Sequence, residues 1–305
     1  MEQQLGVDEF LALLLRLAAP LAALDMPLLD AHGATLAEDI YAGERLVLKG
    51  GTRIRSTQIG LAASIGLNHL PTLPHPRVVV ISAGDDLVEP GQRLADLDDE
   101  FESNSWMLTT SVREAGATGF RVHTIAENHQ QLKEIIEDQL VRADLLVISG
   151  ESHDESFDLI TSVLRELGDV HSVRPKISES GLHNFGLIGP DRTPVITLPG
   201  DPIVTAIAAE IFVRPMIRTM LGAANIYRNE VKAKLTSAIV SPVGERSFIR
   251  ATLSNEAGVS ATPLPDQNNL TSLSEAQAFI IVPEDVSGYK AGSLVDVMLL
   301  ERSNN

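Results

Sequence analysis

Hydrophobic residues recur at helical spacing near the start of the chain, and a similar pattern follows Ser56. Spacings of three and four residues predict an amphipathic helix that ends before Pro20, and Ser56 is a suitable N-cap for another helix. A short helix is also expected over 34–40. The apolar positions of the first helix are Val7, Phe10, Leu11, Leu14, Leu15 and Leu17. Residues 1–70 are therefore predicted to form a helical, elongated N-terminal domain, bounded by the proline-rich stretch 71–76.

From residue 77 the pattern changes to continuous apolar runs separated by helical patterns. The runs over 77–82 and 144–149 are expected to be strands that are covered on both faces. Further strands are predicted over 120–125, 171–175 and 194–198, and helices over 103–115, 130–142, 157–167 and 202–220. This alternation predicts an α/β fold with a doubly wound, mostly parallel sheet, and we assign it to a domain over residues 71–225.

The last part of the chain has a third pattern, in which short runs of alternating apolar residues are separated by glycines and prolines. Such runs predict strands of a small antiparallel domain. They lie over 231–235, 247–253, 279–282 and 293–297. Residues 226–305 are therefore predicted to form a small C-terminal domain that resembles a β-barrel.

Composition narrows the range of partners. The 305 residues include no cysteine, which excludes disulfides, thiolate metal sites and a cysteine nucleophile. The formal charge of −17 disfavours nucleic acid and anionic membrane surfaces as partners. The N-terminus lacks the positive region of a secretory signal, and the apolar stretch 10–24 is too short to cross a bilayer. We expect a cytoplasmic protein that binds no nucleic acid and does not insert directly into membranes.

Three polar turns follow predicted strands, and in a parallel sheet they would converge on one crevice at the carboxyl edge. Each turn taken alone is also explained by ordinary turn chemistry. The candidate site residues on these turns, and at the start of the helix over 103–115, are Asp85, Asp86, Ser103, Asn104, Gly150, Gly200 and Asp201.

The loop after Gly150 is unusual for an anion-binding crevice. A loop that cradles phosphate needs small residues and free backbone N–H groups, yet residues 151–158 carry four carboxylates. Asp85, Asp86, Asp154 and Asp158 are candidate ligands for a divalent cation such as Mg²⁺. The alternative is a solvated acidic rim without metal. No other cofactor is indicated.

The order and spacing of these motifs resemble the molybdopterin molybdenumtransferase family, which includes the E domain of gephyrin. The resemblance extends over nearly the whole chain. The matching segments are 27–40, 82–87, 102–105, 198–202, 245–251, 272–276 and 291–295. The resemblance implies the three-part fold above, a homodimer, Mg²⁺ in the crevice, and insertion of molybdate into adenylylated molybdopterin.

The chain departs from this family at several positions. In the family, a whole domain with a Met-Asp-Gly-Tyr-Ala motif lies between the equivalents of Asp39 and Gly51, and only 40–50 fills that interval here. The lysine-containing run that faces the anionic cofactor corresponds to 178–182, without lysine. Ser156 stands at the family's acidic catalytic position, whereas Asp158 keeps its type. Asp201 and Val204 replace the family's asparagine and serine.

The loss of the lysines and the added carboxylates, among them Glu179 and Asp201, make the crevice less attractive to anions. We therefore interpret the chain as a degenerate, non-catalytic member that acts as a dimeric protein-binding or regulatory scaffold. The alternative is an active molybdenumtransferase. An apolar stripe of Phe10, Leu14 and Leu17 is expected to pack against either a second subunit or the rest of its own domain.

Overall fold

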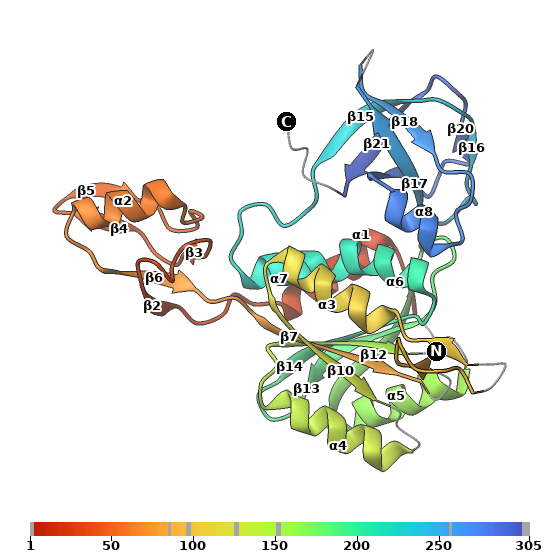
Figure 1. Cartoon of the computed structure of the whole chain (residues 1–305), viewed down its shortest axis with the longest axis horizontal. Coiled ribbons are helices and arrows are strands. Elements are labelled where there is room, and N and C mark those ends of the chain that lie inside the picture. Colours follow the sequence, from red (N-terminus) through yellow and green to blue (C-terminus); the bar gives the residue numbers. More distant parts are fainter. Residues whose placement is uncertain are drawn as a thin grey trace.

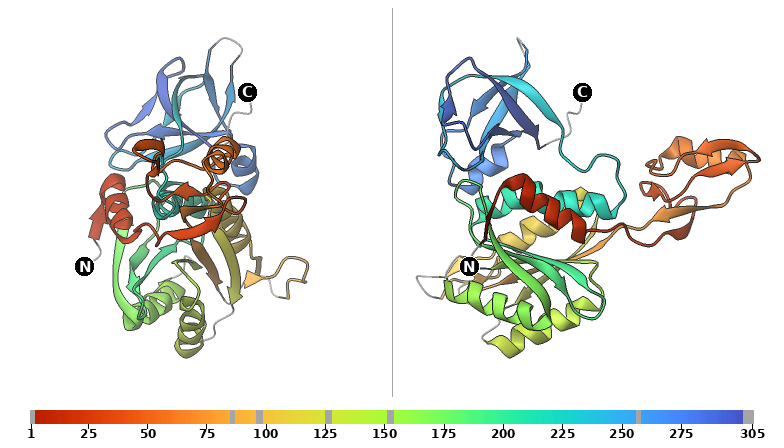
Figure 2. Two further views of the ribbon diagram at one scale, coloured as in Figure 1. Left: turned by 90° about the vertical axis from the view of Figure 1, so that its left-hand side faces the viewer. Right: turned by 180° about the vertical axis from the view of Figure 1, so that it is seen from behind.

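The computed structural model describes residues 3–84, 87–95, 99–124, 128–150, 154–255 and 258–300. A central α/β body carries a segment that protrudes to one side and a β-barrel that lies above it in Figure 1. Figure 2 shows from the opposite side as well that the protruding segment extends away from the body. The mixed α/β architecture and the small C-terminal barrel agree with the fold class expected from the sequence.

The central sheet has seven strands in the order β1-β12-β13-β14-β11-β7-β10. Neighbouring pairs are parallel except where β13 pairs with β12 and β14. The strands are β1 (Gln3–Leu5), β7 (Arg77–Ala83), β10 (Thr118–Thr124), β11 (Leu145–Gly150), β12 (Gly168–Pro175), β13 (His183–Ile188) and β14 (Thr193–Leu198). The sheet is therefore mostly parallel and doubly wound, with one antiparallel strand that the hydrophobic pattern did not predict.

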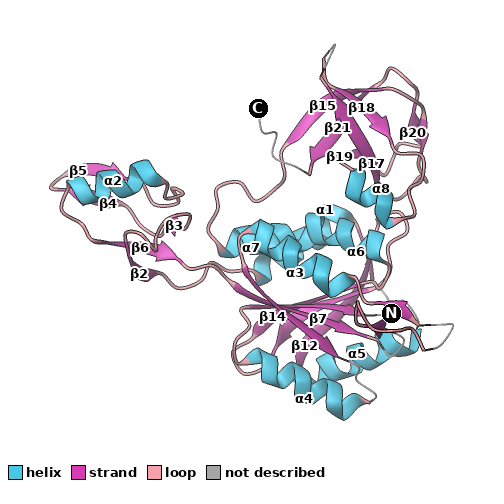
Figure 3. Ribbon diagram, in the orientation of Figure 1, coloured by secondary structure: helices cyan, strands magenta, loops and turns pink. Residues whose placement is uncertain are grey.

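Alternate residues of the central strands bury opposite faces of this sheet. Val78 and Val80 belong to one apolar layer, whereas Val79 and Ile81 belong to the other. The helices α4 (His129–Leu140) and α5 (Asp154–Leu167) cover the second face (Figure 3). The first face is covered by α1 (Val7–Leu17), α3 (Asn104–Ala115), α6 (Pro202–Ala208), the π-helical turn η1 (Ala209–Val213) and α7 (Arg214–Met220).

The N-terminal helix α1 packs on the central sheet and not on the protruding segment. Its Phe10 is fully buried, with ring centroids 5.2 Å from Phe185 and 4.8 Å from Phe212. The preceding β1 also pairs with β12 of the sheet. The apolar stripe of this helix is thus covered within the chain, by the α/β body, and it needs no second subunit for its burial.

The protruding segment is built mainly from strands. Strands β2 (Leu24–Pro27), β6 (His69–Leu73) and β3 (Thr35–Leu36) form one sheet, and β4 (Ile40–Ala42) pairs with β5 (Arg45–Leu48). The helix expected over 34–40 is absent from these described residues, where strands and turns occur instead. Only α2 (Ser56–Ser64) is helical here, and the small core includes Leu36, Ile54 and Leu70.

The β4–β5 hairpin occupies the interval in which the family resemblance places an extra domain. Ala42 pairs directly with Arg45, and Gly43 has a φ of 61°, which suits a tight turn. Below the hairpin, the backbone N–H of Gly50 donates to Asp39 Oδ1 at 2.7 Å. The two ends of the interval are therefore joined directly by a short, hydrogen-bonded hairpin.

The C-terminal part is a closed barrel in the order β15-β18-β17-β19-β21. The elements of this part are β15 (Glu230–Leu235), β16 (Ile239–Val240), β17 (Ser247–Ser254), β18 (Ser260–Pro263), α8 (Leu270–Glu275), β19 (Ala278–Val282), β20 (Gly288–Tyr289) and β21 (Leu294–Leu299). All four strands expected from the alternating pattern are present. Two further short strands, β8 (Leu87–Val88) and β9 (Glu100–Phe101), pair near the body. Within the described part of the chain, no helix has the length and apolar character required to cross a membrane.

We expect Phe10→Ala to lower the free energy of unfolding by about 3–5 kcal/mol, because it removes a fully buried ring from an aromatic cluster and leaves a cavity. Urea denaturation would measure the change. Leu29→Ala is the matched control, since Leu29 is 85% exposed, and it should change the free energy by less than about 0.5 kcal/mol. Equal losses in the two variants would contradict the docking of α1 on the sheet.

Candidate functional site

Three strand ends meet at one edge of the central sheet. Ser149 of β11 lies beside Ser82 of β7 on one side and beside Leu198 of β14 on the other. Because these strands are parallel, their carboxyl ends and the turns after them lie together. The helices α3 and α6 begin at this same edge, so residues distant in sequence share one crevice.

Asn104, at the first position of α3, connects two of these turns. Its Nδ2 donates to Ser149 Oγ at 3.0 Å and to the backbone carbonyl of Gly200 at 2.6 Å. The residue is only 8% exposed, and its Oδ1 accepts no hydrogen bond. A buried amide oxygen without a donor is costly, so Asn104 keeps one unused acceptor at the place where these turns meet.

A buried carboxylate fixes the start of α3. Glu102, which is 1% exposed, accepts hydrogen bonds from the Ser105 backbone N–H at 2.7 Å and from Ser105 Oγ at 2.5 Å. It also pairs with Arg121 at 3.2 Å. Burial alone would raise the pKa of Glu102, but these hydrogen bonds outweigh it and hold the pKa below its usual value. Arg121 in turn lies 4.1 Å from the ring centroid of Trp106, which gives that half-exposed ring a packing role.

Beside the crevice lies a cavity of about 230 Å³, which we call the crevice cavity. Arg174, Glu179 and Asp201 are the charged side chains among its described lining residues. Arg174 donates to the Ser180 carbonyl at 3.2 Å. Glu179 has a φ of 64°, a left-handed conformation that costs a non-glycine residue roughly 1 kcal/mol. A strained backbone thus holds a carboxylate at the border of this cavity.

Asp201 has a defined structural role as the N-cap of α6. Its Oδ1 accepts hydrogen bonds from the backbone N–H groups of Ile203 and Val204, both at 2.9 Å, and Pro202 follows at the first helical position. This is the arrangement expected of an aspartate before a proline. Gly150 has a packing role, because a Cβ at this position would lie 2.5 Å from Ile160 Cδ1.

The remaining sequence-predicted residues are only partly placed. Asp85 and Asp86 lie outside the described residues, and for Asp154 and Ser156 only the backbone, in the first turn of α5, is described. Asp158 is exposed, and Ser103 is the N-cap residue of α3. No group of three or more metal-ligating side chains occurs among the residues the structure describes. The proposed Mg²⁺ site therefore stays a prediction, and no chemical step is assigned to a metal.

Sequence reasoning missed a buried polar network on β13. His183 is fully buried, and its Nδ1 donates to the Thr197 carbonyl at 2.8 Å. Asn184, also fully buried, joins Thr161 and Ser172 through hydrogen bonds of 2.8 and 2.7 Å. The available signal was the pair of polar residues that opens an otherwise apolar run over 183–188. This network holds β13 against α5 and fixes one wall of the crevice cavity.

Comparisons with known proteins agree with this geometry. Residues 79–219 match the family described as "Probable molybdopterin binding domain", and residues 232–300 match "MoeA C-terminal region (domain IV)". Molybdopterin molybdenumtransferase 2 of Mycobacterium tuberculosis is 35% identical over 268 residues, which cover 85% of this chain and 65% of that protein. The molybdopterin molybdenumtransferase of Bacillus subtilis is 28% identical over 281 residues, or 88% of this chain and 62% of that protein.

Solved structures show the same fold. A molybdopterin biosynthesis MoeA protein from Pyrococcus horikoshii superposes with a TM-score of 0.82 at 21% identity, covering 98% of this chain and 100% of that chain. A molybdenum cofactor biosynthesis protein from Pyrococcus furiosus gives 0.74 at 23% identity, with the same coverage.

The fold and the crevice thus define a protein with a molybdopterin-binding type of α/β domain and a MoeA-type C-terminal barrel. The chain belongs to the molybdopterin molybdenumtransferase family. It spans 65% of the length of the Mycobacterium tuberculosis relative that it matches.

His183 should make stability depend on pH. Burial lowers its pKa from 6.5 to about 4, so the unfolded state binds the proton more tightly than the folded state. The stabilisation from the neutral ring is complete above pH 6.5 and is lost as the pH falls toward 4. Between pH 7 and pH 5 we expect a loss of about 2 kcal/mol from this residue. Urea denaturation of the wild type and of His183→Gln at the two pH values would measure the difference.

His183→Gln should be less stable at pH 7, because it loses contacts with Phe10 and Phe212, but its further loss at pH 5 should be smaller. If the variant does not fold, NMR titration of the wild-type imidazole replaces it. An imidazole that titrates near pH 6.5 in the folded protein would refute the prediction.

Proposed function

We propose that this chain is a non-catalytic member of its family and acts as a dimeric scaffold that binds or regulates other proteins. The observation that carries the proposal is the charge balance at the crevice cavity. Two carboxylates, on Glu179 and Asp201, border the space where the family resemblance implies lysines facing an anionic cofactor. An anionic pterin phosphate and molybdate would therefore meet no excess of positive charge.

The nearby cations do not reverse this balance. Arg174 lines the crevice cavity and already donates to Ser180. Arg250 of β17 is 3% exposed, and burial lowers its pKa, an effect partly opposed by attraction to Glu179 and Asp201. Two cations thus face two carboxylates, and the sequence adds four more carboxylates over 151–158. Unit charges about 4–6 Å apart interact by a few kcal/mol at an effective dielectric constant near 20, so several such terms weaken anion binding by orders of magnitude.

The β4–β5 hairpin supports the same proposal. It closes the interval over 40–50 with a short turn, and the sequence of this interval contains no Met-Asp-Gly-Tyr-Ala motif. The aspartate that the family resemblance assigns to this motif is therefore missing from the interval. A chain that lacks this carboxylate and has a neutralised crevice lacks two separate requirements of molybdate insertion.

The second candidate function is molybdate insertion by an active enzyme. The observation in its favour is the crevice geometry, in which Asn104 still bridges Ser149 and Gly200 and presents an acceptor without a partner. The printed names of the relatives also point to this activity. The two candidate functions differ in whether the crevice binds the pterin substrate, and a direct binding measurement distinguishes them.

The proposed dimer has a candidate surface on the protruding segment. This segment has a small core but exposes five large hydrophobic side chains, namely Leu24, Leu29, Tyr41, Leu46 and Leu61, with exposures from 40% to 85%. Apolar groups displayed on a thin extension are typical of interfaces. A second copy of the chain is the simplest partner, because a two-fold axis lets one patch cover its own equivalent. We place the protein in the cytoplasm, where the family's chemistry would occur.

Calorimetric titration with adenylylated molybdopterin at moderate salt tests the loss of substrate binding. We expect no binding tighter than about 100 µM in the wild type. Glu179→Gln combined with Asp201→Asn should raise the affinity at least about tenfold, since it removes two carboxylates while the asparagine amide oxygen still caps α6. Asp191→Asn, on an exposed turn, is the matched control and should change nothing. Micromolar binding by the wild type, or restored molybdoenzyme activity in a strain without its transferase, would establish the active enzyme instead.

Light scattering after size exclusion tests the dimer. At micromolar concentration the protein should have twice the mass of the 32.8 kDa chain, because a stable interface buries on the order of 1,600 Å². Leu29→Glu combined with Tyr41→Glu should shift the mass to that of a monomer without loss of folding, as both side chains are exposed. A monomeric wild type would remove the dimer from the proposal.

A further inference from the structure

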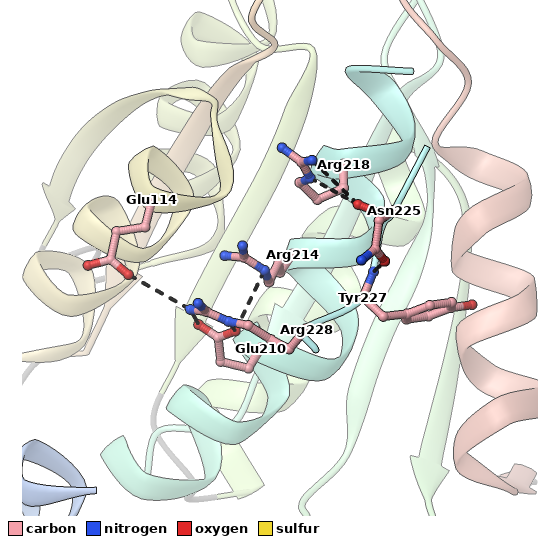
Figure 4. Close-up of polar contacts among 7 residues, drawn as sticks. All are labelled: Glu114, Glu210, Arg214, Arg218, Asn225, Tyr227 and Arg228. Atoms are coloured by element: carbon pink, nitrogen blue, oxygen red, sulfur yellow. Dashed lines mark hydrogen bonds and ion pairs between the residues drawn. The ribbon is translucent and has the colours of Figure 1, made fainter. Parts of the chain in front are cut away.

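A second, larger cavity lies where the protruding segment joins the α/β body. Its volume is about 780 Å³. The C-terminal end of α3, helix α7 and the linker 223–228 form its walls on the body, and turns of the protruding segment at Gly33 and Gly51 form the opposite wall. Figure 4 shows part of it, with arginines from α7 and from the linker grouped near Glu114 and Glu210. We call this space the arginine cavity.

Its charge is opposite to that of the protein. The described lining residues include five arginines and a single carboxylate, that of Glu114. The arginines are Arg53, Arg113, Arg214, Arg218 and Arg228. The chain as a whole has a formal charge of −17, so a cavity lined by five arginines is an exception in a strongly acidic protein. A concave wall of one sign focuses the electrostatic field and attracts ions of the opposite sign.

Arg214 is the buried arginine of this cavity whose side-chain donors lack acceptors. Its side chain is 14% exposed, and its Nε and Nη1 donate no hydrogen bond. The nearest carboxylate, Glu210, is occupied by Arg228, which binds it through two hydrogen bonds of 2.7 and 2.8 Å. Arg214 Nε therefore remains 4.0 Å from Glu210 (Figure 4). Buried guanidinium donors without acceptors are costly, and Arg214 also lines the cavity, so an anion bound there would meet a guanidinium that no carboxylate already neutralises.

The electrostatics of Arg214 agree with an excess of positive charge. Burial is the largest cause that lowers the pKa of Arg214. The positive charge of the neighbouring Arg228 lowers this pKa further, whereas the carboxylate of Glu210 opposes the change. The backbone places the residue directly after the π-helical turn η1, where the Arg214 N–H bonds to the carbonyl five residues earlier. Pro215 has no N–H to continue the α-helical ladder, which explains the turn. Such π-turns are frequent at functional sites.

Ordinary structural roles account for three of the five arginines. Arg113 and Arg218 lie in the last turns of α3 and α7, where cations compensate the helix dipole. Arg228 neutralises Glu210. These roles leave Arg214, which lies inside the continuous helical run from α6 to α7 and has donors without acceptors, and Arg53, which reaches the cavity from the protruding segment. These two residues need a different explanation.

We propose that the arginine cavity binds a phosphate-bearing small molecule. Guanidinium groups bind phosphate through paired, charge-assisted hydrogen bonds, and the cavity lies within the range of about 300–1,000 Å³ typical of small-molecule sites. Arg214 supplies the buried anchor, and Arg53 contacts the same ligand from the protruding segment. Binding of such an anion would connect that segment to the body through its charge.

This site is distinct from the crevice. Asn104 marks the N-terminal end of α3 at the crevice, and Arg113 marks the opposite end at the arginine cavity. Residues nine positions apart on an α-helix are separated by about 14 Å along its axis. No residue lines both the crevice cavity and the arginine cavity in the described part of the chain.

Calorimetric titration of the purified full chain with inorganic pyrophosphate tests the proposal. We expect saturable binding with a Kd between about 10 µM and 1 mM at low salt, weaker at high salt because charge attraction is screened. Arg214→Gln should weaken binding at least about tenfold, as it removes a charge-assisted contact. Arg93→Gln is the matched control, because Arg93 is exposed and does not line the cavity, and it should bind like the wild type.

Two further variants make the result unambiguous. Arg53→Gln changes an exposed residue, so it should fold normally and still weaken binding several-fold, even if Arg214→Gln fails to fold. Arg174→Gln at the crevice cavity should leave pyrophosphate binding unchanged. The proposal is overturned if the wild type shows no binding at about 10 mM pyrophosphate, or if Arg174→Gln abolishes binding while Arg53→Gln and Arg214→Gln retain it.

Discussion

The burial of β7, β11 and β14 on both faces is the constraint on which the rest of the structure depends. Val78 and Val79 belong to different apolar layers, so helices must cover both sides of the sheet. Each connection between parallel strands must also bring the chain back to the edge where the previous strand began. The carboxyl ends of the strands then meet, and the turns after them form the crevice. Asn104 contacts both Ser149 and Gly200 for this reason, although 45 and 96 positions separate it from them in the sequence.

Periodicity predicted the sheet and the barrel because both depend on repeated local patterns. It predicted that α1 is a helix but not that α1 packs on the central sheet. An apolar stripe identifies the residues that must be buried, but it does not identify the element that covers them. The antiparallel strand β13 was missed because it opens with His183 and Asn184, whose polar groups are satisfied only by distant partners such as Thr197 and Thr161. The short strands of the protruding segment were missed because two- to four-residue strands carry almost no pattern.

Some features of the candidate site could likewise be predicted from the sequence, and others could not. The convergence of the strand-end turns follows from parallel topology and was predictable. Asp201 was interpreted as a repulsive charge at the crevice, and the structure shows that its carboxylate also caps α6, a role that the Asp-Pro pair in the sequence already favoured. The arginine cavity gave no sequence signal, because Arg53, Arg113 and Arg214 are brought together only by the fold. Clusters of this kind depend on tertiary contacts between elements that are far apart in the sequence.

The dipole of helix α3 explains the charged residues at its two ends. At its positive end, the buried carboxylate of Glu102 accepts the Ser105 N–H, and at its negative end Arg113 lies in the last turn. Both charges stabilise the helix itself and need no ligand. Arg214 does not fit this pattern, since it lies inside the continuous helical run from α6 through η1 to α7 and at neither end of it. A buried guanidinium with donors that have no acceptor is retained at a cost to the free protein, and an anion shared with Arg53 is the contact that would offset this cost.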